Sequence, residues 1–432
     1  MNKKEYFQTI IEKLEKLQLE GFEGFSIASL LYVPTRLYLT ENIGKKSKLK
    51  IIQPFLFDIN DFSIVNSKSD VMIYFSYRYN KRIDMHEIFN SMMKCLDGDC
   101  AIEGFRKFKL RLDYLKNIIY IYKWKRDLRK VGINKDIIKF YIPYLAKGMN
   151  FISFLHRNLN VLQNKKVMVT IFDQDYDEYL ITEFCKKMCI KTATIQHGQF
   201  MGKTNLQSIE AIPFPYCNLN ADYFLAWGNC SKDRAIECGV MPDKIFITGN
   251  PKYMYSENKF IPKSLEINSI LIFLDGGKND FSRNCHLLDI MKSVSSNNGI
   301  RCSIKLHPNA DEQIKMKVHE FGCFEVVNST EKIKELAQKY DAFVCSKSTV
   351  YSELLYLNCV TFRYVENDEN DLLYPYTENM DFRDYEGLYS SMDYYNHNPE
   401  EYMNILKKLS QYINGSGDIK NNFSEAIDRL KR

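Results

Sequence analysis

Residues 342–357 read AFVCSKSTVYSELLYL. Four apolar residues, as in a buried strand, come first, and a turn rich in hydroxyl side chains follows them. The rest of the stretch has the apolar spacing of a helix. It therefore predicts a strand over 342–345 and a helix over 349–357, which together form the unit from which parallel α/β sheets are built.

The same alternation of strand and helix continues along the chain in two series. We expect strands of the first series at 71–77, 167–172, 192–196, 223–227 and 244–248, and of the second at 269–274, 302–306, 324–327, 342–345 and 360–364. Segments with the helical period separate the strands within each series. The sequence therefore predicts an α/β protein with two Rossmann-like domains, each built on a parallel sheet.

The domain boundary is expected at a Gly-Asn-Pro sequence that separates the two series. A chain of 432 residues is too long for one ordinary core and suits two domains. Gly249, Asn250 and Pro251, with the polar stretch that follows to Pro262, end any regular element. We predict an N-terminal domain at 1–255 with a helical insertion at about 80–160, and a C-terminal domain at 263–432 that ends in a helical tail.

The formal net charge of +5 is unevenly distributed. Residues 105–130 contain ten Lys or Arg against two Asp, interleaved with aromatic side chains. Such a segment suits anionic lipid headgroups or a polyanionic chain, although a solvated helix with its apolar side in the core has the same pattern. The predicted patch for an acceptor or a membrane consists of Arg106, Lys109, Lys123, Trp124, Lys125 and Arg126. No recognised nucleic-acid motif accompanies it, so we expect no nucleic-acid partner.

The apolar runs of the sequence bear on its location. None approaches the ~18 residues that a membrane span needs, and the N-terminus has the pattern of an amphipathic helix and not of a signal peptide. We therefore expect a cytoplasmic protein, placed at the inner face of the plasma membrane where the basic segment binds lipid.

Candidate catalytic residues follow strands of the first series, because ligands of parallel sheets bind at the carboxyl ends of strands. His197 follows the strand at 192–196 and precedes a glycine. A histidine with a pKa near ~6.5 can take the proton from an attacking hydroxyl there, whereas a histidine hydrogen-bonded in a turn is the plain alternative. Asp173 and Asp175 follow the strand that ends at Phe172, and each is an alternative base or an acceptor-site residue.

Candidate donor-binding residues follow strands of the second series. A histidine before proline lies at the sheet edge and can stabilise charge on a departing phosphate. Paired glycines let the backbone approach a phosphate, and hydroxyl residues at a helix start suit an anion or cap the helix. A glutamate one turn further on could meet a ribose hydroxyl or face solvent. The predicted donor site consists of Gly276, Gly277, Lys305, His307, Pro308, Ser346, Ser348, Thr349 and Glu353.

The order of these motifs along residues 165–365 resembles the bacterial surface-glycan transferases of the GT-B fold. That group includes the CDP-glycerol and CDP-ribitol phosphotransferases of teichoic acid synthesis and the capsule polysialyltransferases and Kdo transferases. The resemblance implies a deep cleft between two Rossmann-like domains, a nucleotide held by the C-terminal domain, and an inverting displacement without metal or cofactor. It also implies that His197 is the histidine of the first domain, that His307 is the His-Pro histidine, and that Ser346, Ser348 and Thr349 hold phosphate.

Departures from the teichoic acid enzymes refine the expected reaction. Those enzymes usually have His-Gly-Thr-Pro after the first strand, whereas this chain has Gln196-His197-Gly198-Gln199, which is more similar to the sugar transferases. We therefore expect a glycosyltransferase that moves a sugar from a nucleotide donor, with a CMP-sugar favoured, to a free or lipid-linked glycan of capsule or lipopolysaccharide type. Asp173-Gln174-Asp175 has the spacing with which GT-A transferases hold a metal, but acids before a helix also interact favourably with its dipole, and no metal is expected.

Three alternatives stay open. The first is a CDP-polyol phosphotransferase of the teichoic acid type. The second is an enzyme similar to the UDP-N-acetylglucosamine 2-epimerases, whose Thr-Gly-Asn and His-Pro-Asn segments match 248–250 and 307–309, although the Ser-Gly-Gly expected after Cys345 is missing. The third is a glycan-binding protein without catalysis.

Overall fold

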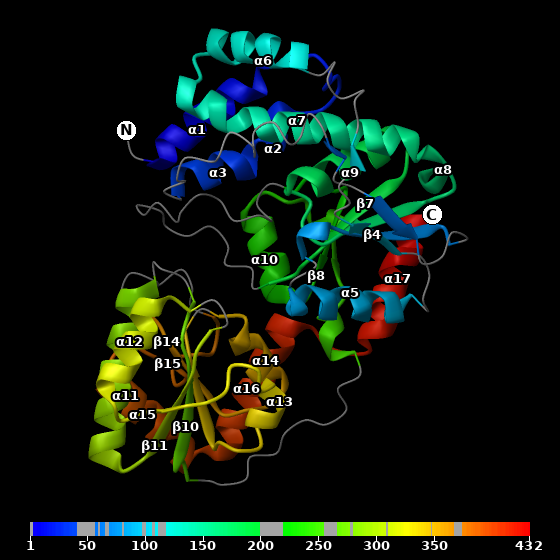
Figure 1. Ribbon diagram of the computed structural model, residues 1–432. Coiled ribbons are helices and arrows are strands. Elements are labelled where there is room, and N and C mark those ends of the chain that lie inside the picture. The colour runs from blue at the N-terminus through cyan, green and yellow to red at the C-terminus, as the bar shows by residue number, and fades with distance from the viewer. Residues whose placement is uncertain are drawn as a thin grey trace. The chain divides into compact units, whose positions relative to one another are not determined.

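A computed structural model describes residues 3–40, 57–58, 61–64, 69–79, 82–96, 101–105, 109–110, 118–198, 219–254, 266–276, 280–307, 310–346, 348–366 and 374–432. The chain forms two compact units (Figure 1). Unit 1 consists of Met1–Trp227, Ser231–Met254 and Gly417–Arg432, and unit 2 consists of Gly228–Cys230 and Tyr255–Ser416. Each unit has its own largely parallel sheet, which confirms the predicted α/β fold class.

The sheet of unit 1 has seven strands in the order β2-β4-β3-β6-β7-β8-β9 within the described residues. All neighbours are parallel except for the edge strand β2, which is antiparallel to β4. Chain order reverses between β3 and β6, which is the position where open parallel sheets bind ligands. The strands are β2 (Asp61–Ile64), β3 (Val71–Phe75), β4 (Ala101–Phe105), β6 (Val167–Thr170), β7 (Lys191–Ile195), β8 (Tyr223–Ala226) and β9 (Ile245–Ile247).

Helices cover both faces of this sheet. In β3, Ile73 and Phe75 pack toward α5 (Ile83–Cys95) and α17 (Ile419–Lys431), which lie side by side (Figure 1). Tyr74 packs on the opposite face, where the remaining helices of the unit gather. Strands buried on both faces require continuous apolar runs, which explains why these segments were easy to predict. The other helices are α1 (Lys3–Glu15), α2 (Ile27–Leu30), α3 (Tyr32–Thr40), α6 (Ile118–Lys130), α7 (Lys135–Arg157), α8 (Leu159–Leu162), α9 (Tyr176–Lys187) and α10 (Asn229–Glu237).

The predicted helical insertion at about 80–160 is wrong in its first part. Helix α5 connects β3 to β4, and β4 pairs in parallel with β3, so that Ile73 lies opposite Ala101. The segment is therefore one more repeat of the sheet. The basic segment likewise begins as the end of β4 and continues as β5 (Lys109–Leu110), which pairs with β1 (Phe57–Asp58). Its helix starts only at Ile118.

The sheet of unit 2 has six strands, all parallel, in the order β12-β11-β10-β13-β14-β15 within the described residues. This is the Rossmann order, and the reversal lies between β10 and β13. The strands are β10 (Ser269–Phe273), β11 (Arg301–Lys305), β12 (Glu325–Val326), β13 (Ala342–Cys345), β14 (Thr361–Tyr364) and β15 (Asp381–Phe382). The sequence predicted only helix from about 381 onward, because a strand of two residues has no periodicity to detect.

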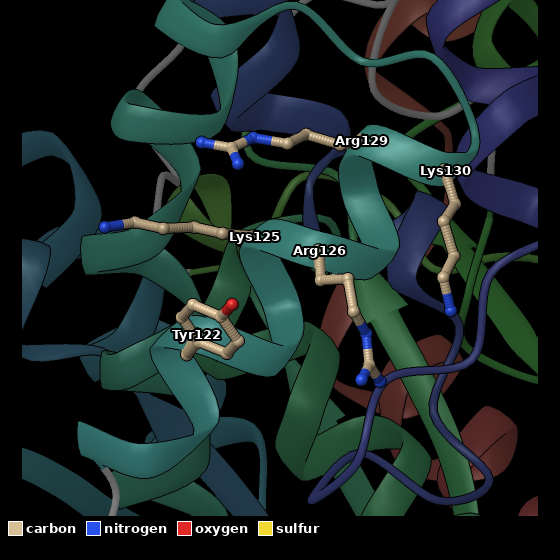
Figure 2. Close-up of a pocket in the computed structure, with 5 residues that line it drawn as sticks. All are labelled: Tyr122, Lys125, Arg126, Arg129 and Lys130. Carbon is tan, nitrogen blue, oxygen red and sulfur yellow. The ribbon is translucent and has the colours of Figure 1, made fainter.

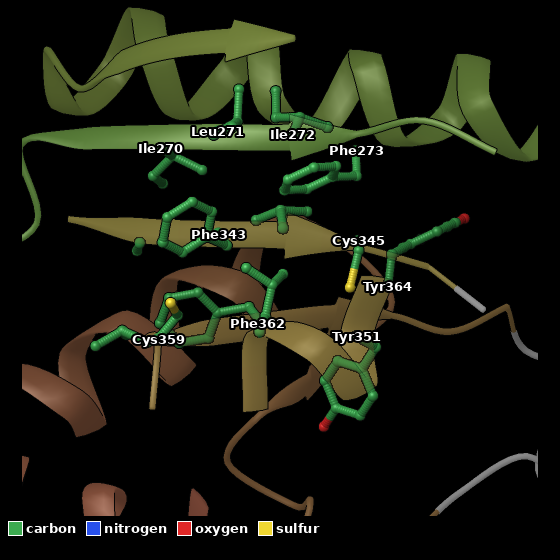
Figure 3. Packing of buried hydrophobic residues seen from close by; sticks show 14 of the residues in the cluster. Ile270, Leu271, Ile272, Phe273, Phe343, Cys345, Tyr351, Cys359, Phe362 and Tyr364 are labelled. Carbon is green, nitrogen blue, oxygen red and sulfur yellow. The ribbon is translucent and has the colours of Figure 1, made fainter. Parts of the chain in front are cut away.

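The core of unit 2 lies between the strands and the helices that cover them. Figure 3 shows Phe273 of β10, Phe343 of β13 and Phe362 of β14 in this cluster. The rings of Phe273 and Phe343 lie 6.3 Å apart between centroids. The helices are α11 (Phe281–Asn298), α12 (Glu312–Phe321), α13 (Ile333–Leu336), α14 (Val350–Tyr356), α15 (Tyr385–His397) and α16 (Pro399–Asn414).

The last helix of the chain belongs to unit 1, not to unit 2. Helix α17 buries Phe423, Ile427 and Leu430 in the same cluster as β3 and β6. The C-terminal domain was predicted at 263–432, whereas the main part of unit 2 runs from Tyr255 to Ser416. None of the described helices is both long and apolar enough to cross a bilayer.

Candidate functional site

His197 leaves the sheet of unit 1 at the carboxyl end of β7. Its Nδ1 atom lies 3.0 Å from the carbonyl oxygen of Ile171, at the end of the neighbouring strand β6. A carbonyl only accepts hydrogen bonds, so Nδ1 carries the hydrogen and the lone pair of the neutral ring is on Nε2. The ring of Phe172 meets the half-buried imidazole edge to face, with centroids 5.2 Å apart. The histidine is thus fixed in the tautomer that a base acting through Nε2 requires.

Gln196 fixes the turn that presents this histidine. Its side chain is buried and uses both ends, because Oε1 accepts the backbone N–H of Trp227 at 2.8 Å and Nε2 donates to the carbonyl of Gly198 at 2.8 Å. From the sequence, this glutamine indicated only a similarity to the sugar transferases. Its positioning role could not be predicted, since Trp227 is distant along the chain.

Asp173 anchors the chain where it enters β8. The carboxylate is 1% exposed, and its Oδ2 accepts the backbone N–H groups of Asn220 at 2.7 Å and Ala221 at 2.6 Å. Burial raises the pKa of Asp173 to about 6, while these two backbone bonds oppose the rise. The side chain of Asp173 therefore has a structural role, which is to hold this segment of backbone. Its role as a base stays a prediction.

Asp175 pairs with an arginine that follows β3. Its Oδ1 lies 2.7 Å from Nη1 of Arg78, and the two side chains are 8% and 33% exposed. Burial raises the pKa of Asp175 to about 6, while the guanidinium of Arg78 opposes the rise. The guanidinium carbon also lies 5.9 Å from the ring centroid of Tyr176. Arg78 was not predicted as a site residue. It follows the strand, and its sequence neighbours do not distinguish it from an ordinary surface arginine.

Two further acids of the same run are buried rather than solvated. Asp177 accepts hydrogen bonds from Ser76 and from the hydroxyl of Tyr74, the latter at 3.0 Å. Glu178 accepts three hydrogen bonds, from the hydroxyl of Tyr79 and from the backbone N–H groups of Ile171 and Phe172. The sequence indicated acids that meet the helix dipole of α9, and both do lie in its first turn, but their full burial was not foreseen. Across the described residues, no group of three or more His, Cys, Asp or Glu side chains is arranged to hold a metal ion.

In unit 2, Gly276 and His307 come together at the carboxyl edge of the sheet, where Gly276 follows β10 and His307 follows the neighbouring β11. Phe273 lies opposite Lys305, so the segments that follow β10 and β11 leave the sheet at the same edge. A Cβ atom at position 276 would overlap the imidazole of His307, which means that the backbone of Gly276 lies directly against the ring. The preceding residue is held by Asn284, which accepts the N–H of Asp275 at 3.1 Å and donates to its carbonyl at 2.9 Å. Gly277 and Pro308 lie outside the described residues.

Lys305 is engaged by the loop after β12. Its ammonium donates to the carbonyl oxygens of Asn328, Ser329 and Glu331 at 3.1, 2.8 and 2.9 Å. These three bonds use all the hydrogens of a lysine side chain. A direct contact with a donor phosphate would have to replace one of them.

The hydroxyl residues after β13 differ in their surroundings. Ser346 is 1% exposed, and within the described residues its Oγ has no hydrogen-bond partner. A buried hydroxyl without a partner costs about 1–3 kcal/mol, so this atom suits a bound polar group. Ser348 accepts the N–H of Val350 at 3.3 Å, and Thr349 is exposed at the start of α14 without making a side-chain cap. Glu353 is half-buried in the first turn of that helix.

The predicted basic patch is reduced to the exposed face of α6. Figure 2 shows Tyr122, Lys125, Arg126, Arg129 and Lys130 around a surface hollow of about 460 Å³. The placement of Trp124 in the patch is wrong: this residue is fully buried and its indole N–H donates to the carbonyl of Glu20 at 3.0 Å. Lys123 contacts the carboxylate of Glu20 at 2.7 Å. Arg106 and the side chain of Lys109 lie outside the described residues.

Comparisons with known proteins establish the fold. No family model and no curated protein sequence matches the chain. A Listeria monocytogenes structure assigned as a UDP-N-acetylglucosamine 2-epimerase aligns over 83% of this chain and 95% of its own, with a TM-score of 0.51 and 13% identity. The S. aureus MnaA–UDP co-structure aligns over 84% and 95%, with a TM-score of 0.51 and 10% identity. The wall teichoic acid polymerase TagF aligns over 93% and 94%, with a TM-score of 0.45 and 10% identity. The first two likenesses agree with a two-domain GT-B type of fold.

Proposed function

We propose that the protein is an inverting, metal-independent glycosyltransferase that moves a sugar from a nucleotide donor to a bacterial surface glycan. A CMP-sugar is the favoured donor, and a capsule or lipopolysaccharide glycan is the favoured acceptor. The observation that carries the proposal is the contact of Gly276 with His307 at the carboxyl edge of the unit 2 sheet. It places an imidazole against the backbone that follows β10, a strand that borders the chain reversal, where Rossmann sheets bind nucleotides.

The donor nucleotide would occupy the carboxyl edge of the unit 2 sheet. Because Gly276 has no side chain, the imidazole of His307 can pack against its backbone, and the exposed ring can donate a hydrogen bond to a phosphate there. Ser346, directly after β13, the strand next to β10, offers a buried hydroxyl that lacks a partner among the described residues. The S. aureus MnaA structure is described as a UDP complex, so a protein of similar fold does accept a nucleotide.

The base of the proposed reaction is His197 of unit 1. An acceptor hydroxyl oxygen forms a bond to the anomeric carbon of the donor sugar while the bond from that carbon to the phosphate oxygen breaks. The electron pair of the broken bond leaves with the nucleotide, and the hydroxyl proton passes to Nε2 of His197. The hydrogen bond from Nδ1 to Ile171 holds the ring in the required tautomer before and after this transfer.

The exposed face of α6 is proposed to contact an anionic membrane or an anionic glycan near it. Three apolar or aromatic side chains of the helix are unusually exposed, namely Ile118 at 47%, Ile119 at 63% and Tyr122 at 77%. Lys125 and Arg126 line a surface hollow together with Tyr122. A helix that combines apolar tips with cationic side chains suits the interface of an anionic bilayer, at the inner face of the plasma membrane.

The first experiment is a thermal-shift screen with CMP, CDP, UMP, UDP and GDP in EDTA, because a ligand of the folded state raises its melting temperature. Donor consumption is then measured with CMP-sialic acid, CMP-Kdo, CDP-glycerol and UDP-N-acetylglucosamine, with and without capsule glycans. We expect a cytidine nucleotide to give the shift and a CMP-sugar to be consumed only with acceptor. Consumption of CDP-glycerol, epimerisation of the UDP-sugar without acceptor, or no reaction at all would each overturn the proposal in favour of one of the alternatives.

Histidine variants assign the two roles. His197→Ala should abolish transfer and leave nucleotide affinity within about twofold, since the base acts only in the chemical step. His307→Ala should weaken nucleotide binding as well. His286→Ala, an exposed histidine on α11 of unit 2, is the matched control and should change neither. Transfer by His197→Ala at the wild-type rate would show that another group is the base.

A further inference from the structure

We propose that Glu178 is a positioning residue for His197 and that it acts through the peptide group between Ile171 and Phe172. This inference rests on the proposed function of His197 as base. Neither the sequence motifs nor the resemblance assigns any role to Glu178, which lies in the first turn of α9.

The carboxylate of Glu178 is held by three donors. Its Oε1 accepts the backbone N–H of Ile171 at 3.1 Å, and its Oε2 accepts the backbone N–H of Phe172 at 3.0 Å. The hydroxyl of Tyr79 donates to the same Oε2 at 2.8 Å. Glu178 is fully buried, and Tyr79 is 6% exposed. Burial and the neighbouring carboxylates of Asp177 and Asp175 raise the pKa of Glu178, while its hydrogen bonds with Tyr79 and Ile171 oppose the rise.

One of these bonds leads directly to the histidine. The N–H of Phe172 and the carbonyl of Ile171 belong to the same peptide group. Glu178 accepts the hydrogen bond of this N–H, and the carbonyl accepts the hydrogen bond of Nδ1 of His197. The carboxylate and the imidazole are therefore joined through a single planar peptide. Because its π electrons are delocalised, an acceptor at the N–H increases the negative charge on the carbonyl oxygen.

Two consequences follow for the imidazole. The carbonyl becomes a stronger acceptor, which favours the tautomer with hydrogen on Nδ1 and the lone pair on Nε2. The same interaction stabilises the imidazolium that forms when Nε2 takes a proton. Glu178 also fixes the end of β6 against α9, and Phe172 lies against the imidazole ring. The buried glutamate thus sets both the orientation and the basicity of His197 without touching it.

Glu178→Gln is the variant that tests the link. Its amide presents one NH₂ group, so one of the two backbone N–H groups that Glu178 accepts loses its acceptor. We expect kcat to fall roughly 10- to 100-fold, the range for loss of a group that orients a functional histidine, with the Kd of the nucleotide unchanged. Glu183→Gln on the same helix is the matched control, because Glu183 pairs only near the surface, with Lys186 at 2.7 Å.

The decisive readout is the tautomer of His197, observed by ¹⁵N NMR of the full chain labelled at histidine and assigned with His197→Ala. In the wild type we expect a protonated Nδ1 and an unprotonated Nε2. In Glu178→Gln the two nitrogen shifts should move toward each other as the second tautomer becomes populated, and Tyr79→Phe, which leaves the peptide link in place, should change them much less. Unaltered shifts in a folded Glu178→Gln variant would refute the proposal.

The wild-type spectrum alone keeps the inference testable if Glu178→Gln does not fold. Hydrogen on Nε2 of His197 in the wild type would rule out the link, because the carbonyl of Ile171 could then not be its acceptor. This measurement needs no substrate. If His197→Ala transferred sugar normally while the tautomer behaved as expected, the proposed base would be wrong and the positioning by Glu178 would stand.

Discussion

Replacing Gly276 by alanine perturbs the proposed donor site with one methyl group. The new Cβ would lie 3.0 Å from the Cβ of His307 and 2.5 Å from its Cγ. Nonbonded carbon atoms prefer at least about 3.5 Å, so the ring has to move by about 1 Å. Because the ring of His307 is exposed, we expect its side chain to rotate away from the methyl group, at a cost of about 1 kcal/mol of unfolding free energy.

The main expected effect is on binding and turnover, not on stability. A displacement of about 1 Å in a positioned group costs up to about 100-fold, or about 2.7 kcal/mol. We expect kcat/KM for the donor to fall by roughly this factor and the nucleotide Kd, measured by calorimetry, to rise by a part of it. Gly299→Ala is the control in the same unit: nothing lies within 4 Å of its Cβ, and its φ of +66° should cost about 1 kcal/mol of stability without changing Kd.

A double-mutant cycle decides whether His307 transmits the effect. If the methyl group acts by displacing the imidazole, Gly276→Ala should cause little further loss in a His307→Ala background. Fully additive losses in the double variant, or a single Gly276→Ala variant with unchanged kcat/KM, would refute the assignment of this contact to the donor site.

The remaining predictions concern stability and membrane binding. Burial raises the pKa of Asp173 to about 6, so the folded state holds an extra proton below that pH, and this contribution to stability is lost as pH rises through 6. Between pH 4.5 and 7, the free energy of unfolding of the wild type in urea should therefore fall by about 2 kcal/mol relative to that of Asp173→Asn, and parallel curves would contradict the pKa. The double variant Lys125→Glu with Arg126→Glu should weaken pelleting with phosphatidylserine vesicles at least about 30-fold, at about 1 kcal/mol per charge, whereas Trp124→Phe, at a buried position, should leave pelleting unchanged. Equal pelleting of the wild type and the charge variant would show that α6 does not contribute to membrane binding.

The sequence by itself determined the two sheets and the residues at most of their carboxyl ends. Strands buried on both faces require continuous apolar runs, so β10 and β13 were evident without any knowledge of their neighbours. The residues that follow such strands, such as His197 and His307, could be located by counting from the strand ends. The local sequence pattern was sufficient to predict these strands, because a strand that is buried on both faces has apolar side chains along its own length.

Only the tertiary structure decided which distant segments meet. The amphipathic pattern of α17 predicts a helix but does not indicate which unit the helix packs against. A tryptophan such as Trp124 can lie on a surface or in a core, and the sequence does not distinguish the two. Glu178 resembles any acid in a first helical turn until the fold places it against the peptide that holds His197. Such pairings depend on packing and hydrogen bonds between residues that are far apart in the chain, and no periodicity of the sequence records them.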